Sequence, residues 1–209
     1  MRWIITITLS LITFNSFAPP VPLYMVYDPY VEQIYKDHCT INNNLEKLYD
    51  DDIRTRPEVF QLIQPILEIY LREYTDNYVI GDSLSWALAC IFVSESSNGK
   101  GHSGRSTLWL EHNNPFGMTT GKIGKNVTKM SWEMINGNRV NMYRTFKTYN
   151  SLKEATESLL WDYLLKERYE PVRQAITVKE FLHILINCGY ATNLGWSNWA
   201  HKEIYLKSI

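Results

Sequence analysis

Residues 86–117 decide the fold, and they read WALACIFVSESSNGKGHSGRSTLWLEHNNPFG. The stretch opens within an apolar run that has helical spacing and ends on a carboxylate. The members of that run are Leu84, Leu88, Ile91, Phe92 and Glu95. Residues 81–83, Gly-Asp-Ser, give a helix start signal before it. Residues 96–107 are small, polar and Gly-rich, so we expect a loop directly after the helix.

Glu95 is the most informative residue of this stretch, because it lies on the apolar side of the predicted helix at its last turn. Burial disfavours the carboxylate form and raises the pKa of a carboxyl group. A carboxyl that stays protonated near neutral pH is what a glycosidase needs to protonate a leaving oxygen. The alternative is a helix-end glutamate that turns outward to water.

A hairpin is predicted over residues 127–148. Residues 130–135 alternate between two faces, and Asn136-Gly137 is a strong turn signal before the return strand. Glu133 lies on the first strand and is the candidate second carboxylate, facing Glu95 across a cleft between lobes. Glycoside hydrolysis commonly uses such a pair. The alternative is a solvated strand residue without a catalytic role.

Helices are predicted on both sides of the hairpin. Residues 57–70 have helical spacing, with Pro65 expected to kink the helix or divide it into two. Capping boxes begin at Ser151 and Thr177, and Gly189 is a stop signal. The sequence therefore predicts a mainly α (α+β) fold, a helical domain with a small β-hairpin lobe.

The composition excludes several functions. A formal net charge of −1, with the basic residues spread along the chain, argues against a nucleic-acid partner. The histidines lack zinc-site spacing and the serines lack a nucleophile elbow, so no metal site and no serine hydrolase are expected. Cys39, Cys90 and Cys188 are too few for a disulfide scaffold, although a Cys39–Cys188 bridge stays open.

Residues 1–18, MRWIITITLSLITFNSFA, have the pattern of a signal sequence. Their apolar stretch, residues 3–14, is short for a membrane span, and residues 16–18 have the small-x-small form of a cleavage site. Because Pro19 disfavours cleavage, membrane attachment through residues 3–14 stays open. We expect export to the periplasm or cell envelope, a linker or helical arm over residues 19–56, and a catalytic domain over residues 57–209.

Several motifs, in order, resemble the glucosaminidase family, glycoside hydrolase family 73. The sequence carries ALACIFVSES, then Gly99, Ser106-Thr107-Leu108 and Asn113-Asn114-Pro115-Phe116-Gly117. Glu133 precedes Asn136-Gly137 and Phe146-Lys147-Thr148-Tyr149, where the family has a Phe-Arg-x-Tyr-like strand. Arg168-Tyr169 and the GYAT motif at residues 189–192 follow.

The resemblance implies a lysozyme-like fold and an endo-β-N-acetylglucosaminidase that acts on peptidoglycan glycan strands without a cofactor. It places the family's catalytic glutamate on Glu95 and the second functional one on Glu133. Residues expected to bind substrate are Asn114, Phe116, Gly117, Tyr169 and Tyr190, and a monomer is expected. Two alternatives stay open: a muramidase or lytic transglycosylase of similar fold, and a non-catalytic wall-binding assembly protein.

Overall fold

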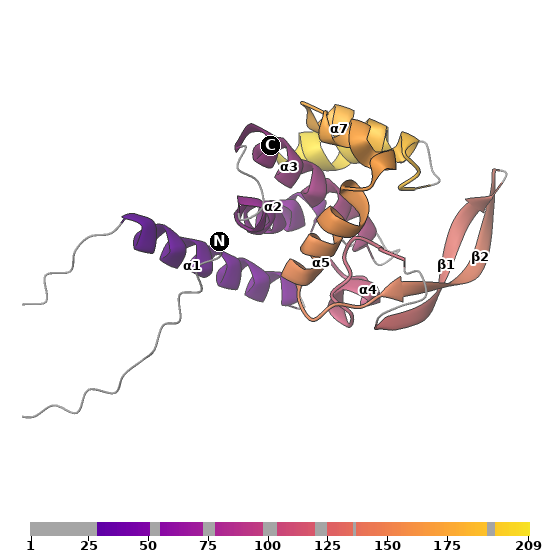
Figure 1. Ribbon diagram of the computed structural model, residues 1–209. Coiled ribbons are helices and arrows are strands. Elements are labelled where there is room, and N and C mark those ends of the chain that lie inside the picture. The colour runs from indigo at the N-terminus through magenta and orange to yellow at the C-terminus, as the bar shows by residue number, and fades with distance from the viewer. Residues whose placement is uncertain are drawn as a thin grey trace, which may run out of the picture.

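A computed structural model describes residues 29–50, 55–72, 78–97, 104–119, 125–135, 137–191 and 195–209. Its helices and strands are α1 (Pro29–Tyr49), α2 (Arg56–Arg72), α3 (Tyr78–Glu95), α4 (Thr107–Leu110), β1 (Asn126–Ile135), β2 (Asn138–Lys147), α5 (Leu152–Leu159), the π-helix η1 (Leu160–Leu164), the 3₁₀ helix η2 (Glu167–Tyr169), α6 (Glu170–Arg173), α7 (Val178–Asn187), α8 (Trp196–Ala200), the π-helix η3 (His201–Tyr205) and α9 (Leu206–Ser208). The helices form one body, from which the β1–β2 hairpin projects (Figure 1). The mainly helical fold with one small antiparallel sheet is as predicted.

The segment predicted as a signal sequence lies outside the described residues, and so do residues 19–28 of the predicted linker. Within the part of the chain that the structure describes, no helix is both long enough and apolar enough to cross a membrane.

Helix α3 is the centre of the core. Residues 87–93 all have no exposed surface, so this helix is buried on every side rather than along one apolar stripe. It begins at Tyr78, earlier than the predicted signal at residues 81–83. Helix α2 packs against it, and a buried hydrogen bond joins Gln64 to Ser85. α2 runs through Pro65 as one helix, so of the two predicted outcomes, a kink or two short helices, the division into two is wrong. Packing of its nine buried residues against the core outweighs the hydrogen bond that proline removes.

Helix α1 lies within the predicted linker or helical arm, and its C-terminal end is part of the core. Leu48 is buried there, and the Asn44 side chain donates a hydrogen bond to the Leu62 carbonyl of α2. Tyr49 stacks on the buried ring of Trp109, with centroids 5.1 Å apart, and its hydroxyl donates to Asn113 Oδ1. These contacts join α1 to residues 109–113, which lie beyond the loop after α3.

The hairpin has the predicted strands and turn. Ile135 pairs with Asn138 across the turn, and Gly137 has a φ of +78°, which glycine adopts readily. Phe146 and Glu133 lie on the less exposed face. Met130 and its partner Tyr143, on the other face, are 63% and 72% exposed.

Both predicted helix N-caps form, but the glutamate of each predicted box accepts from the amide before the cap, that of Asn150 or Ile176. The Ser151 hydroxyl accepts a hydrogen bond from the Glu154 amide and so begins α5. Thr177 accepts one from the Glu180 amide in the same way and begins α7. Gly189, with a φ of +82°, follows the end of α7. The three cysteines are free thiols, so no Cys39–Cys188 bridge forms.

Candidate active site

Glu95 is the last residue of α3, where the buried core helix reaches the surface. Its side chain is only partly exposed, and burial raises its pKa to about 7. Desolvation disfavours the charged carboxylate, so a large share of Glu95 carries a proton at neutral pH. Such a raised pKa is what a proton donor needs, and the acid role of Glu95 stays a prediction.

The backbone after Glu95 is held in place by Ser96. The Ser96 carbonyl accepts hydrogen bonds from the amides of Arg105 and Ser106, at 2.9 and 2.8 Å. Its hydroxyl donates to the Phe92 carbonyl and accepts from the Gly104 amide. Ser96 thus ties the far end of the following loop back to the helix and fixes where Glu95 emerges. The sequence analysis did not assign it this role; the Glu-Ser motif with a glycine eight residues later was the available signal.

The turn that contains Gly117 forms the wall beside Glu95. Gly117 has a φ of +65°, and a Cβ added there would lie 3.1 Å from Glu95 Oε2. Real Cβ contacts are rarely that close, so a glycine allows the carboxyl group and the turn to lie against each other. Gly117 and Glu95 were predicted separately, and the structure places the Glu95 carboxyl beside Gly117.

Asn114 and Phe116 support the same turn from below. Asn114 is buried, donates through Nδ2 to the carbonyls of Met118 and Lys147, and accepts from the Met118 amide. The buried Phe116 ring packs edge-on against Phe92 of α3. With so little exposed surface, these two residues shape the site, and direct contact with a sugar would require them to be uncovered.

Two tyrosines predicted to bind substrate lie in different surroundings. Tyr190 is partly exposed, and its hydroxyl donates to the Phe116 carbonyl at 2.7 Å. Burial, and then the nearby charge of Glu95, raise the pKa of Tyr190 well above its usual value. Tyr169 has no exposed surface, and the Arg168 guanidinium packs over its ring and donates to its hydroxyl. Tyr190 can reach a ligand beside Glu95 as it stands; Tyr169 cannot.

Glu133 lies near the turn end of β1 and forms an ion pair with Arg144 from β2. Its side chain is 18% exposed. Nearer the base of the hairpin, Lys129 donates to the side chains of Thr107 and Glu111 at the two ends of α4. The hairpin therefore determines where Glu133 lies, and the helical core determines where Glu95 lies.

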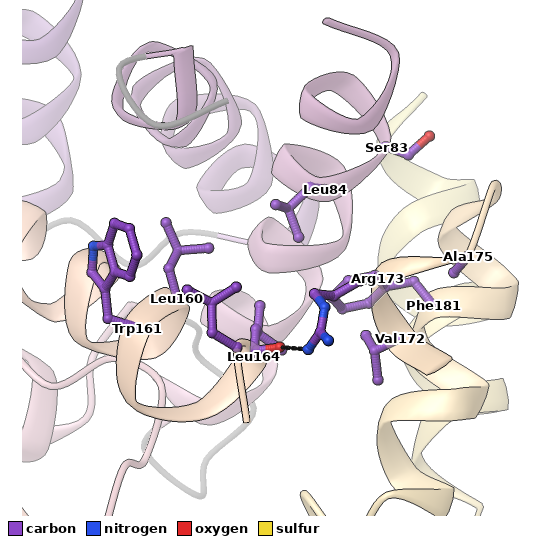
Figure 2. Close-up of a pocket in the computed structure, with 10 residues that line it drawn as sticks. Ser83, Leu84, Leu160, Trp161, Leu164, Val172, Arg173, Ala175 and Phe181 are labelled. Carbon is purple, nitrogen blue, oxygen red and sulfur yellow. Dashed lines mark hydrogen bonds between the residues drawn. The ribbon is translucent and has the colours of Figure 1, made fainter. Parts of the chain in front are cut away.

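An apolar cavity of about 360 Å³ lies near the other end of α3 (Figure 2). Leu84 lines it and lies roughly 16 Å along the helix axis from Glu95. The walls of the cavity come mainly from α3, η1 and α6, with Phe181 of α7, and include Leu164 and Val172. A cavity this apolar suits no polyhydroxylated sugar, so it is distinct from the site around Glu95. Among the described residues, no group of three or more His, Cys, Asp or Glu side chains could hold a metal ion.

A helical body with a small hairpin lobe is a lysozyme-like α+β arrangement, and a match to a family model makes the protein a glycoside hydrolase. The chain belongs to the glucosaminidase family: the family model described as mannosyl-glycoprotein endo-beta-N-acetylglucosaminidase matches residues 70–205. Comparison with curated proteins finds no match.

Three solved structures are similar in fold. A peptidoglycan hydrolase mutant from Sphingomonas sp. A1 is 23% identical, with a TM-score of 0.49, over 57% of this chain and 78% of that one. A C-terminally truncated glycoside hydrolase domain of Salmonella typhimurium FlgJ is 19% identical, with a TM-score of 0.48, over 74% and 99%. The catalytic domain of the Listeria monocytogenes autolysin Auto is 21% identical, with a TM-score of 0.49, over 87% and 95%. The family assignment rests on the family model.

Proposed function

We propose that this protein is a peptidoglycan hydrolase, an endo-β-N-acetylglucosaminidase that cleaves the glycan strand on the reducing side of N-acetylglucosamine. Glu95 is the general acid in this proposal. The observation that carries it is the confined Glu95 carboxyl, with its pKa raised to about 7, beside Gly117. A general acid works best when its pKa lies near the working pH, because it is then often protonated and still gives up its proton readily.

The test is a digest of purified sacculi, followed by identification of the new reducing-end sugar by mass spectrometry. N-acetylglucosamine at the new reducing end is expected. N-acetylmuramic acid there would indicate a muramidase, and its anhydro form would indicate a lytic transglycosylase. Binding to sacculi with no release of fragments would indicate a wall-binding protein without activity.

Glu133 has one of two roles in this proposal. As a general base it would activate a water molecule for inversion, which suits carboxyl groups about 6.5–9.5 Å apart. In a substrate-assisted route, the 2-acetamido oxygen would attack the anomeric carbon and Glu133 would orient that group. The ion pair with Arg144 supports either role, because it gives Glu133 a defined orientation on the hairpin.

The configuration of the first-formed product separates these routes. NMR that detects an initial α-product from a β-linkage would establish inversion and exclude substrate assistance. An initial β-product would exclude the inverting base. A covalent retaining route would require the two carboxyl groups to be only about 5 Å apart, and we rank it last.

Export is part of the same proposal, because peptidoglycan lies outside the cytoplasm. It rests on the signal-like pattern of residues 1–18. Fractionation of cells that produce the protein, with sequencing of its mature N-terminus, would test export and would distinguish a cleaved signal from an anchor. Recovery of the full chain in the cytoplasm alone would reject export.

A further inference from the structure

The exit of strand β2 is fixed to the turn that borders Glu95. The Lys147 amide donates to the Met118 carbonyl at 3.0 Å, and the Lys147 carbonyl accepts from Asn114 Nδ2 at 2.8 Å. The next two amides, of Thr148 and Tyr149, donate to the carbonyls of Lys125 and His112. The amides of Lys147 and Tyr149 therefore join the end of the hairpin to residues 112–118, and the Thr148 amide closes the base of the hairpin on Lys125. These three amides are the junction amides.

The Lys147 side chain extends this junction to the helices beyond the hairpin. Its ammonium donates to Asp162 Oδ2 of η1 at 2.5 Å and to Ser158 Oγ of α5 at 3.1 Å. Ser158 in turn donates to the same Asp162 oxygen and accepts from the Tyr149 hydroxyl. These four side chains form a connected network around one ammonium group.

The two partners of this pair differ in exposure. The Lys147 side chain is 23% exposed and lies over the ring of Tyr163, whose hydroxyl donates to the Thr119 carbonyl, whereas the Asp162 side chain is 50% exposed. The hydrogen bond from Lys147, and then that from Ser158, lower the pKa of Asp162. Asp162 therefore carries its charge at neutral pH, when the enzyme would act. π-helical turns such as η1 are uncommon and frequently occur at functional sites.

We propose that Lys147 and Asp162 form a positioning pair that fixes the hairpin on the helical body and so sets how Glu133 faces Glu95. The second part of this statement rests on the proposed function. Neither residue touches the reacting atoms in this proposal. They act through the backbone of residues 147–149, and the hairpin carries Glu133.

The test uses Asp162→Ala and Lys147→Met in the full chain. Hydrogen exchange measured by NMR should become faster at the amides of residues 147–149 and stay unchanged in α3. Lys147→Arg keeps the charge and should restore slow exchange. Glu203→Gln is the matched control, because it breaks the Lys207–Glu203 pair, which has the same 2.5 Å separation far from the hairpin in sequence. Unchanged exchange at the three junction amides in both test variants would overturn the proposal.

Kinetics on sacculi provide a second readout. Misplacing groups at a distance from the reaction should lower kcat by about tenfold to a hundredfold, with little change in KM. The limb of the pH profile that reports Glu95 should not move. An unchanged kcat would overturn the positioning role. So would a shift in the Glu95 limb of the pH–rate profile that is large enough to explain the fall in kcat. If wild type releases no fragments, the proposed function fails, and the exchange data still decide whether the pair fixes the junction.

Discussion

Glu95 and Glu133 are both partly buried glutamates, but the chain holds them in different ways. Glu95 ends a helix that the core surrounds, and its carboxyl lies against the backbone of Gly117. Glu133 lies on a two-stranded hairpin, where Arg144 provides a counter-ion. The first arrangement favours a protonated acid at a fixed place. The second favours a charged group whose place follows the hairpin.

The largest expected effect comes from removing the acid itself. Glu95→Gln keeps the shape of the side chain and removes its acidic proton. Activity on purified sacculi should fall about a hundredfold to ten-thousandfold, the usual contribution of general acid catalysis. Glu46→Gln, at an exposed position on α1, is the control and should match wild type. More than about a tenth of wild-type activity in Glu95→Gln would remove Glu95 from the acid role.

The same substitution should stabilise the protein at alkaline pH. The folded-state pKa of Glu95 is raised to about 7 from 4.5. The contribution of its protonated carboxyl to the free energy of unfolding is therefore complete below about pH 4.5 and is lost as pH rises through about 7. Glutamine does not ionise and avoids that loss. The free energy of unfolding of Glu95→Gln should therefore exceed that of wild type by about 2 to 3 kcal/mol at pH 9, and the difference should shrink towards pH 4. Urea unfolding at both values, with Glu46→Gln as control, checks this; a difference independent of pH would contradict it.

Gly117→Ala tests the wall that confines Glu95. The added Cβ would meet Glu95 Oε2 at 3.1 Å, so the carboxyl or the turn must move. We expect a loss of kcat/KM of about tenfold to a hundredfold, because small displacements of catalytic groups are costly. Gly189→Ala is the matched control: its φ of +82° is also strained for alanine, but nothing lies within 4 Å of the added atom. Equal losses of activity in the two variants would show that backbone strain, rather than the contact with Glu95, is responsible.

This contact also shows where sequence reasoning ends. The hairpin turn at residues 136–137 and the helix N-caps at Ser151 and Thr177 depend on neighbouring residues, so local patterns were enough to predict them. That Gly117 lies against Glu95 depends on how two segments, separated by a loop, pack on one core. No local pattern contains that information.

Longer-range packing explains the other differences as well. The continuity of α2 through Pro65 and the burial of Tyr169 depend on packing against distant segments. A glutamate within an apolar run was enough to select Glu95 as a candidate, because burial follows from such a run. The orientation of Glu133 depends on the hairpin as a whole, so the sequence could name the residue but not place it.

Glu133→Gln should have a smaller effect than the loss of Glu95. An amide can still orient an acetamido group but cannot act as a base, and it loses the ionic part of the contact with Arg144. We expect kcat on sacculi to fall by about tenfold to a hundredfold. Arg144→Gln should give a similar but milder loss, because the carboxylate remains but is less well oriented. A rate within twofold of wild type for Glu133→Gln would favour an enzyme with Glu95 as its sole essential carboxylate.

Tyr190→Phe should have the smallest effect and separates support of the site from contact with substrate. The variant keeps the ring and removes the hydroxyl that donates to the Phe116 carbonyl at 2.7 Å. Loss of one such hydrogen bond typically costs about 0.5–1.5 kcal/mol of stability. The hydroxyl oxygen can also accept a hydrogen bond from a sugar, and the charge of Glu95 raises the pKa of this phenol, which places the two groups near each other.

Two measurements on the same variant then decide between the roles. A fall in the free energy of unfolding with unchanged kcat/KM means that the hydroxyl only supports the turn beside Glu95. A several-fold fall in kcat/KM at full stability means that it contacts the substrate, and wild-type values of both would show that the hydroxyl serves neither purpose.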